Sequence, residues 1–545
     1  MEAVSTSRDD TRRPARLPPW GQAAVLIAAA LAVLWPALDA GFIWDDIRQI
    51  ESSPTITDPR APLEYFSLNV VESWGSEGRG GEGVDTYRPL FFVALWSIHR
   101  INGPDPFWFH LAVIVAHLAV CLLLWIAARR WLGSDLAAAG VFTAVAIHPV
   151  TAEATLWASA LSEPMSVAGL LGAALILDRW CRAGARNPAA VVAAGATMLL
   201  GLLSKEAVLT ALPVVTLYLW RARCVRISAL AGPWAAAGVF IALRVHALDG
   251  LQATGSSADQ RLDALRNFPV LIVDGLRALL TLQPVGVRHL YWDYRSVSWA
   301  MSLLAASVVV ALCVLAWLAR RRAPIVPTAL GVLACMLVPI ALITTAPGWS
   351  GFGRYLYLPW AFIAMALAAA ALHLNERFPR IRPLTLTVVI VFLALELIGL
   401  RHAFGVYCSQ ESLARASVEL QPHAPDGWEW LGNHYVAVDD LANAARCYSE
   451  AVAIEPTIYR PRHNLATALL HLGRPAEALA HETAIAALHG VTADGAAVAA
   501  QACMALGRLE EAGNWVEKGL SVSPDDVTLL ELRSMWLSEE TDKAD

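Results

Sequence analysis

Acidic and basic residues stand at the ends of apolar stretches at several points of this 545-residue sequence. An aspartate at a membrane edge can accept the proton of an attacking hydroxyl. An arginine can hold a phosphate through two parallel hydrogen bonds, and a lysine can add charge. Together these residue types fit the transfer of a group from a lipid phosphate to a hydroxyl. The candidate bases are Asp45 and Asp46, and the candidate phosphate-binding residues are Arg88, Arg354 and Lys205.

A second set of polar residues lies beside these and could orient a substrate hydroxyl or the basic groups. It consists of Tyr87, His148, Glu153, Glu163, Glu206 and Tyr355. Simpler interpretations stay open for several of them. Two adjacent aspartates after an apolar run often only end a helix and meet water. Lys205 and Glu206 could form an ion pair at the membrane interface, and His148-Pro149 could be a turn at a helix end.

Cofactor requirements are weakly specified by the sequence. A divalent cation is optional, although Asp45, Asp46 and Glu163 could supply oxygen ligands. The eight cysteines lie mostly in or beside apolar runs without CxxC spacing, so we interpret them as packing residues and expect neither a disulfide framework nor a metal site. No glycine-rich phosphate loop, HExxH or GxSxG motif is present, which disfavours soluble nucleotide-sugar or hydrolase chemistry.

The amino-acid composition indicates that the candidate site residues belong to a membrane protein. The chain is 57% hydrophobic and 16% charged, with a mean hydropathy of +0.49. Soluble proteins carry roughly a quarter charged residues, so much of this chain must lie in lipid. A net charge of -6 gives no reason to expect a nucleic-acid partner. From about residue 405 onward the composition is that of an ordinary soluble helical domain.

Charge-free runs predict an all-α, polytopic membrane domain with about eleven spans, because a spanning helix needs about 20 mainly apolar residues. The runs are Ala23–Leu38, Phe107–Ala128, Leu136–Ala152, Pro164–Leu177, Asn187–Ser204, Ala207–Trp220, Ile227–Leu243, Ser296–Leu318, Ala323–Phe352, Tyr355–Asn375 and Pro383–Leu400. The first run has no cleavage site after it, so we expect an uncleaved helix rather than a signal peptide.

Arginine clusters predict the orientation of these spans. They are Arg8/Arg12/Arg13/Arg16, Arg129/Arg130, Arg179/Arg182/Arg186, Arg221/Arg223/Arg226, Arg320/Arg321/Arg322 and Arg377/Arg380/Arg382. Placing all six in the cytoplasm puts the N-terminus inside and the C-terminus outside. Leu90–Ile101 and Leu262–Leu282 then lie along the outer interface. The expected domains are a tail over 1–20 and a membrane domain over 21–403 with a large outer loop over 41–105.

The sequence pattern of the C-terminal region, 404–536, predicts a tetratricopeptide α-solenoid, which is followed by a tail over 537–545. Trp428-x2-Leu431-Gly432-x2-Tyr435, with later Ala, Tyr and Pro positions, fits the 34-residue pattern, and Ala444, Ala478 and Ala512 recur at that spacing. Expected repeats cover about 425–458, 459–492 and 493–526. Two interpretations stay open. The array either binds a polypeptide on a concave surface or caps the membrane domain.

The motifs in their order resemble a known family. They are Phe42-x-Trp44-Asp45-Asp46, Tyr87-Arg88-Pro89-Leu90, His148-Pro149-x3-Glu153, Ser204-Lys205-Glu206 and Arg354-Tyr355-Leu356-Tyr357-Leu358-Pro359, followed by the repeats. This arrangement resembles GT-C-type glycosyltransferases, and most of all the transmembrane-and-tetratricopeptide-repeat branch that includes protein O-mannosyltransferases. The resemblance implies a polyprenyl-phosphate sugar donor, inverting transfer, a catalytic aspartate at Asp45 or Asp46, and a protein hydroxyl as acceptor.

Two positions depart from the family pattern. Relatives carry Arg-x-Asp where this chain has Leu161-Ser162-Glu163, and an acid before the arginine where it has Gly353. The predicted function is the transfer of a sugar, with mannose as the first choice, to a protein at the periplasmic face of a bacterial inner membrane. The donor lipid, the acceptor polypeptide and the bilayer are the expected partners. The alternative is a non-catalytic membrane scaffold in which a decayed transferase domain anchors a protein-binding repeat.

Overall fold

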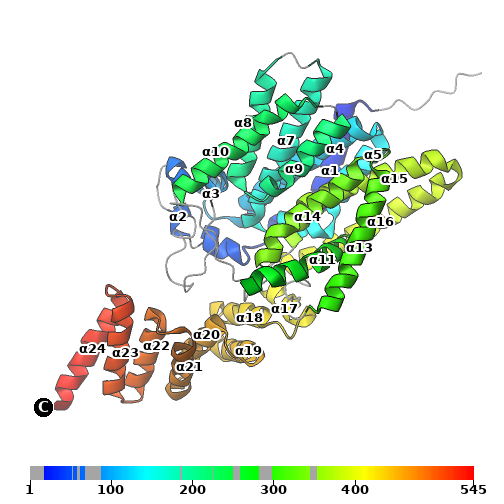
Figure 1. The fold of residues 1–545 in the computed structure, drawn as a ribbon. Helices are drawn as coiled ribbons and strands as arrows, with labels where there is room; N and C mark the ends of the chain where they lie inside the picture. The colour runs from blue at the N-terminus through cyan, green and yellow to red at the C-terminus, as the bar shows by residue number, and fades with distance from the viewer. Residues whose placement is uncertain are drawn as a thin grey trace, which may run out of the picture.

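The computed structural model describes residues 17–51, 53–57, 62–67, 87–184, 187–223, 225–248, 258–281, 297–343 and 353–544. Across these ranges all regular secondary structure is helical, which confirms the all-α class (Figure 1). The tail before residue 17, with its arginine cluster, lies outside the described residues. So do Arg186, parts of the outer loop (58–61 and 68–86), and the segment 344–352 that ends at Phe352.

The membrane domain is a bundle of helices joined by short helical turns. Its elements are α1 (Pro19–Leu34), η1 (Trp35–Asp39), η2 (Ile47–Glu51), α2 (Pro54–Thr57), η3 (Pro62–Phe66), α3 (Pro89–Asn102), α4 (Pro106–Leu132), α5 (Asp135–Ile147), η5 (Pro149–Thr151), α6 (Ala152–Leu156), η6 (Ala158–Leu161), α7 (Ser162–Arg182), α8 (Ala189–Ser204), α9 (Val208–Arg223), η7 (Ile227–Leu230), α10 (Ala231–Ala247), α11 (Ala258–Thr281), α13 (Trp299–Ala319), α14 (Ile325–Ile343), η9 (Gly353–Leu356), α15 (Tyr357–Arg377), η10 (Pro379–Ile381) and α16 (Arg382–Tyr407).

Seven helical segments of the described chain are long and apolar enough to cross a membrane, or eight if one bent pair counts as a span. The chain is therefore a multi-pass membrane protein. The seven are Pro19–Asp39, Pro106–Leu132, Ala158–Arg182, Ile227–Ala247, Trp299–Ala319, Gly353–Arg377 and Pro379–Tyr407. The other expected spans are also helical, in α8, α9 and α14, but these helices are shorter. The count of eleven and the N-in, C-out orientation stay predictions.

Close helix packing in the bundle brings polar helix ends together. Helices α7 and α8 pack against each other. A Cβ at Gly169 of α7 would lie 2.5 Å from the Gly201 Cα of α8, so the contact requires glycine. Small residues at such interfaces let membrane helices approach closely. Because α7 starts at Ser162 and α8 ends at Ser204, the contact brings Glu163 beside Lys205.

The bent pair is broken at His148-Pro149. Helix α5 and the segment Pro149–Leu156 meet at an angle of 50°. Proline lacks the backbone N–H that would continue the helix, and the residue before it avoids the α region. His148 accordingly has ψ of 133°. The break turns the chain so that Glu153 of α6 lies at the end of the bundle that also holds Glu163 and Lys205.

The C-terminal helices stack as antiparallel pairs. They are α17 (Gln410–Leu420), α18 (Pro425–Ala437), α19 (Leu441–Ile454), α20 (Tyr459–His471), α21 (Pro475–His489), α22 (Ala493–Ala505), α23 (Leu509–Val522) and α24 (Val527–Ala544). Ala444, Ala478 and Ala512 are fully buried between helices, as the 34-residue spacing predicts. Gly432 approaches Tyr448 so closely that a Cβ would lie 2.5 Å from its ring. The signature positions thus form the repeat core.

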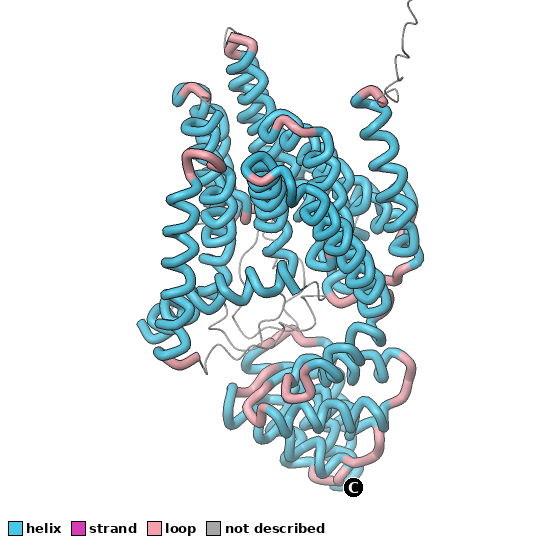
Figure 2. Tube along the Cα trace, turned by 90° about the vertical axis from the view of Figure 1, so that its right-hand side faces the viewer, coloured by secondary structure: helices cyan, strands magenta, loops and turns pink. Residues whose placement is uncertain are grey.

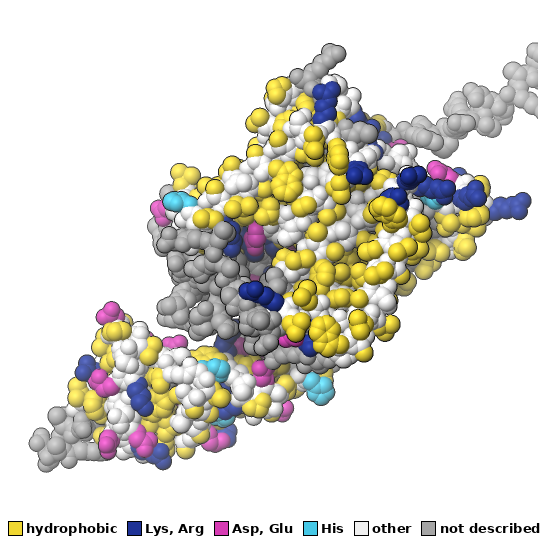
Figure 3. Space-filling view, in the orientation of Figure 1, with side chains coloured by type: hydrophobic (Ala, Val, Ile, Leu, Met, Phe, Trp, Pro, Cys, Tyr) yellow, Lys and Arg dark blue, Asp and Glu magenta, His cyan; other side chains and the backbone are white. Residues whose placement is uncertain are grey.

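The repeats extend from one end of the helical bundle (Figures 1 and 2). Hydrophobic side chains cover the visible face of the membrane domain over α13 and α16, whereas the repeats show a mixed surface (Figure 3). Leu303, Leu318 and Ile390 are among the large exposed apolar residues of these two helices. Such continuous apolar exposure suits contact with lipid rather than water.

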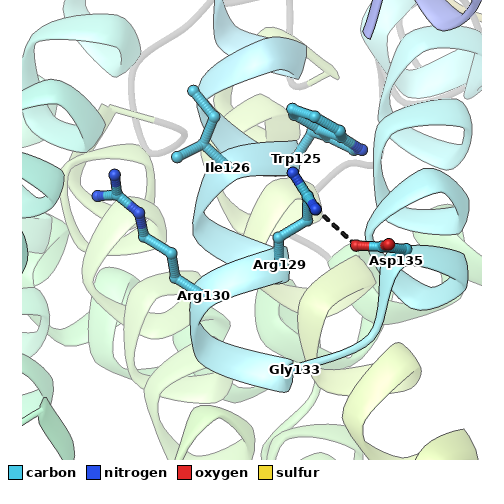
Figure 4. Close-up of a pocket in the computed structure, with 6 residues that line it drawn as sticks. All are labelled: Trp125, Ile126, Arg129, Arg130, Gly133 and Asp135. Atoms are coloured by element: carbon cyan, nitrogen blue, oxygen red, sulfur yellow. Dashed lines mark hydrogen bonds and ion pairs between the residues drawn. The ribbon is translucent and has the colours of Figure 1, made fainter. Parts of the chain in front are cut away.

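A further basic region lies where α4 turns into α5, around a hollow (Figure 4). Arg129 Nε donates to Asp135 Oδ1 at 2.7 Å, and its guanidinium lies 4.7 Å from the Trp125 ring centre. Nearby, the buried Asp178 accepts hydrogen bonds from Arg182 and Arg223. The arginines that set the predicted orientation therefore also join α4 to α5 and α7 to α9.

Candidate active site

The two aspartates of the first outer loop have different environments. Asp46 is fully buried and accepts three backbone N–H bonds, from Ile43 (3.2 Å), Ala158 (3.3 Å) and Ser159 (2.6 Å). Burial raises the pKa of its carboxyl to about 7, although these hydrogen bonds act in the opposite direction. Asp46 thereby fastens the loop to the segment before α7, and its two oxygens are occupied.

Asp45 is less enclosed than Asp46. Its side chain is 28% exposed, and its Oδ2 lies 3.9 Å from Arg354 Nη1. Trp44, just before it, has a φ of +47°, a conformation that costs a bulky residue roughly 1–3 kcal/mol. The loop therefore holds Asp45 beside the guanidinium of Arg354, a residue about 300 positions later in the sequence.

Arg88 and Glu206 form a bidentate ion pair at the start of α3. Arg88 Nε donates to Oε2 at 3.0 Å and Nη2 to Oε1 at 2.7 Å. Burial alone would raise the pKa of Glu206, but Arg88 outweighs it and lowers that pKa to about 2. The sequence suggested a Lys205–Glu206 pair. That interpretation is wrong, because Glu206 contacts Arg88 and Lys205 contacts a different acid.

Lys205 is almost completely buried and pairs with Glu163 at the start of α7. Its ammonium also lies 4.9 Å from the centre of the Tyr355 ring. Burial lowers the pKa of Lys205, and the nearby charges of Arg88 and Arg354 lower it further. Three basic residues therefore share one region, in which Arg88 and Lys205 are paired with carboxylates and a bound anion would favour the charged form of Lys205.

Glu153 supports the segment that carries Arg354. Its Oε2 accepts the Arg354 backbone N–H at 2.7 Å, and its Oε1 accepts the Tyr407 hydroxyl at 3.1 Å. A Cβ on Gly353 would lie 2.8 Å from the Glu153 carboxylate. Glycine at this position, where the family carries an acid, thus leaves room for the carboxylate of Glu153.

Replacing Gly353 with aspartate should destabilise the protein, because the new side chain would collide with Glu153 and place a second carboxylate against it. Overpacking of this kind costs about 1–3 kcal/mol. The double variant Gly353→Asp with Glu153→Ala should recover much of the loss. Melting temperatures of the purified proteins in detergent measure both effects. A single variant as stable as the parent would contradict the close packing.

The Arg354 side chain lies against an aromatic wall. Its guanidinium is 4.8 Å from the Trp157 ring centre and 5.8 Å from that of Tyr355. Among the described residues its Nε is buried without a hydrogen-bond partner. A buried donor of this kind is costly unless a ligand or water satisfies it. Of the three basic residues, Arg354 therefore has a donor still to be satisfied.

Two of the candidate residues lie apart from this group. Tyr87 is buried, and its hydroxyl donates to the Phe66 carbonyl at 3.1 Å. His148 donates from Nε2 to the Leu279 carbonyl at 3.0 Å, accepts from the Val150 N–H, and packs 4.0 Å from the Trp360 ring centre. Its ring also lies 3.9 Å from the buried Glu396. The side chains of Tyr87 and His148 therefore stabilise the fold around the site and do not point into the group of charged residues.

Sequence reasoning missed Trp157 and Tyr407, which contact the Arg354 side chain and Glu153. Trp157 lies in an apolar segment and Tyr407 at the end of a long apolar helix, so neither is distinguished by local pattern. No group of three or more His, Cys, Asp or Glu side chains within the described ranges is arranged to hold a metal ion. Of the three cation ligands considered, Asp46 accepts backbone donors and Glu163 pairs with Lys205.

Helices that can cross a membrane, followed by tetratricopeptide repeats, define the class of this protein. No family model matches the chain. It is 29% identical over 167 residues to human protein O-mannosyl-transferase TMTC1. The aligned region covers 30% of this chain and 17% of that protein. It is 30% identical over 115 residues to Drosophila melanogaster protein O-mannosyl-transferase Tmtc3, covering 21% and 12%. The chain therefore spans less than a fifth of these relatives. The motif-based resemblance to the transmembrane-and-tetratricopeptide-repeat branch is confirmed.

Among solved structures, the first tetratricopeptide domain of human RPAP3 is 26% identical and covers 22% of this chain and 98% of that domain, with a TM-score of 0.21. A tetratricopeptide protein of Thermus thermophilus, TTC0263, is 22% identical, covers 32% of this chain and 88% of that one, and has a TM-score of 0.21.

Proposed function

We propose that this protein is a membrane glycosyltransferase that moves mannose from a polyprenyl-phosphate donor to a protein hydroxyl. The observation that carries the proposal is the position of Asp45, a partly exposed carboxylate 3.9 Å from Arg354 in a region that also holds Arg88 and Lys205. A base beside a phosphate-binding cluster is what such a transfer needs. The similarity to protein O-mannosyl-transferases supports the same chemistry.

In the proposed reaction the acceptor hydroxyl oxygen attacks the anomeric carbon of the sugar while Asp45 takes up the hydroxyl proton. The bond from that carbon to the phosphate oxygen breaks, and its electron pair leaves with the polyprenyl phosphate. Attack opposite the leaving group inverts the anomeric centre. Arg354 binds the departing phosphate through charge-assisted hydrogen bonds, with Arg88 and Lys205 adding positive charge.

Asp46 and Glu153 act as supports in this scheme. Asp46 is fully buried with both oxygens occupied, so it anchors the loop although its pKa of about 7 would suit a base. Glu153 holds the backbone of Arg354. Because Asp46 and Glu163 are engaged within the protein, we expect the transfer to proceed without a divalent cation. Transfer should therefore persist in EDTA.

The proposed location is a bacterial inner membrane, with the site and the repeats on the outer, periplasmic side. The repeats then lie on the side from which a secreted polypeptide would approach, and they would recognise that acceptor. The arginine clusters and the position of the repeats at one end of the bundle support this orientation (Figure 2).

A transfer assay in sealed membrane vesicles tests activity and face together. Polyprenyl-phosphate-mannose is incorporated in the bilayer, and a membrane-impermeant Ser/Thr-rich peptide is added outside. Right-side-out vesicles should mannosylate the peptide, whereas inverted vesicles should do so only after permeabilisation. Activity in intact inverted vesicles would contradict the face. Absence of transfer in both preparations after permeabilisation would favour the scaffold instead.

A further inference from the structure

Trp44 joins the membrane domain to the first repeat. Its ring stacks on Trp157, with ring centres 4.8 Å apart and planes 16° apart. It also packs against Trp430 of α18, with ring centres 4.6 Å apart. Trp44 thus belongs both to the core of the membrane domain and to the apolar cluster of the first repeat.

The backbone of the same loop is held from the C-terminal side. The Trp44 N–H donates to Gln410 Oε1 at 2.8 Å, at the first residue of α17. The Gly41 N–H donates to the Cys408 carbonyl at 3.2 Å. Two backbone groups and one indole of the loop therefore depend on residues more than 360 positions later in the chain.

Trp430 is not explained by the repeat pattern. The signature positions of α18 are Trp428, Leu431, Gly432 and Tyr435. Trp428 has its own partner, since its indole N–H donates to the Pro422 carbonyl at 3.0 Å. Trp430 is nevertheless only 6% exposed, and Trp44 is one of the side chains that cover it.

The stack leads directly to the charged groups. Arg354 lies over Trp157 at 4.8 Å and 3.9 Å from Asp45, the residue that follows Trp44. We propose that Trp430 and Gln410 are positioning residues, through which the first repeat fixes Trp44 and thereby holds Asp45 against Arg354. The repeat array is then part of the catalytic unit rather than only a binding surface. This inference rests on the proposed transfer function.

The physical reason is the conformation of the loop. Trp44 has φ of +47°, which a tryptophan adopts only when its surroundings enforce it. Without Trp430 and Gln410 the Trp44 backbone can relax, and Asp45 must move with it. A displacement of about 1 Å in a reacting group can cost about 10²-fold in rate.

The test compares Trp430→Ala with Trp428→Ala in the purified full-length protein. Both remove the same side chain from the same helix, two residues apart, but it is the Trp430 ring that packs against the Trp44 ring, whereas the Trp428 indole bonds to the Pro422 carbonyl. Trp430→Ala should lower kcat by about 10²-fold with the KM values for donor and peptide near those of the parent. Trp430→Phe, which keeps an aromatic ring, should recover most of the rate. Gln410→Ala should lower kcat in the same direction.

Hydrogen exchange of the peptide covering 41–47 gives a readout independent of activity. Exchange should become faster in Trp430→Ala and stay at the parent rate in Trp428→Ala. Unchanged exchange or unchanged kcat in Trp430→Ala would overturn the inference, as would equal losses of kcat in both tryptophan variants. If the parent transfers no sugar, the proposed function fails. Exchange that is faster only in Trp430→Ala would still support the positioning of the loop, and unchanged exchange would overturn it.

Discussion

Asp45→Asn should lower the rate of sugar transfer by about 10²–10⁴-fold, the contribution that general-base catalysis makes. Asparagine keeps the shape of the side chain but cannot take up the proton of the acceptor hydroxyl. Because Asp45 is partly exposed and its ion pair with Arg354 within the described part of the chain is long, its replacement should leave folding and donor KM nearly unchanged. Steady-state kinetics with saturating peptide measure the effect.

Asp46→Asn is the matched control. Its amide nitrogen would replace one carboxylate oxygen and face backbone donors, either that of Ser159 or those of Ile43 and Ala158, so the loop should lose part of its anchor. An unsatisfied buried group costs about 1–3 kcal/mol, which should appear as a lower melting temperature.

The opposite pattern would identify Asp46 as the base. In that case Asp45→Asn would keep parent turnover, and Asp46→Asn would lose it without melting earlier. The rate of the parent would also rise as pH increases through about 7, because burial places the pKa of Asp46 there and a base must be ionised to act.

Arg354→Ala should raise the donor KM by about 10–10²-fold. A hydrogen bond to a charged group contributes about 1.5–3 kcal/mol, and each 1.4 kcal/mol corresponds to about tenfold in affinity. Arg354 has a buried Nε without a partner among the described residues, and its guanidinium lies on Trp157 beside Asp45. Titration of the polyprenyl-phosphate donor at fixed peptide concentration measures the change.

Arg88→Ala tests the second guanidinium, which already forms two hydrogen bonds with Glu206. Its removal also leaves Glu206 without its counter-charge, so the double variant with Glu206→Gln separates the two effects. We expect a smaller rise in donor KM for the double variant than for Arg354→Ala. If the double variant shows the larger rise and Arg354→Ala shows none, the phosphate binds at Arg88.

The sequence by itself determined the helical class and the register of the repeats. Apolar runs and the 34-residue recurrence of Ala444, Ala478 and Ala512 are visible in the sequence itself. The hydrophobic effect buries these apolar helix faces whatever the arrangement of the helices, so the pattern predicts them directly. The motif order also predicted candidate site residues, and the structure brings several of them together, although their roles stay predictions. The number of spans was not determined in this way, because length and hydropathy alone do not separate a short spanning helix from a buried one.

Only the tertiary structure decided which charges meet. Lys205 pairs with Glu163 rather than Glu206, because the glycine contact of α7 with α8 brings those helix ends together. Glu153 supports the Arg354 backbone because the chain breaks at Pro149 and Gly353 leaves room. Trp44 packs against Trp430, although most of the sequence separates the two residues. Ion pairs and aromatic stacks act over a few ångströms, so they depend on how distant segments pack, which periodicity and spacing do not specify.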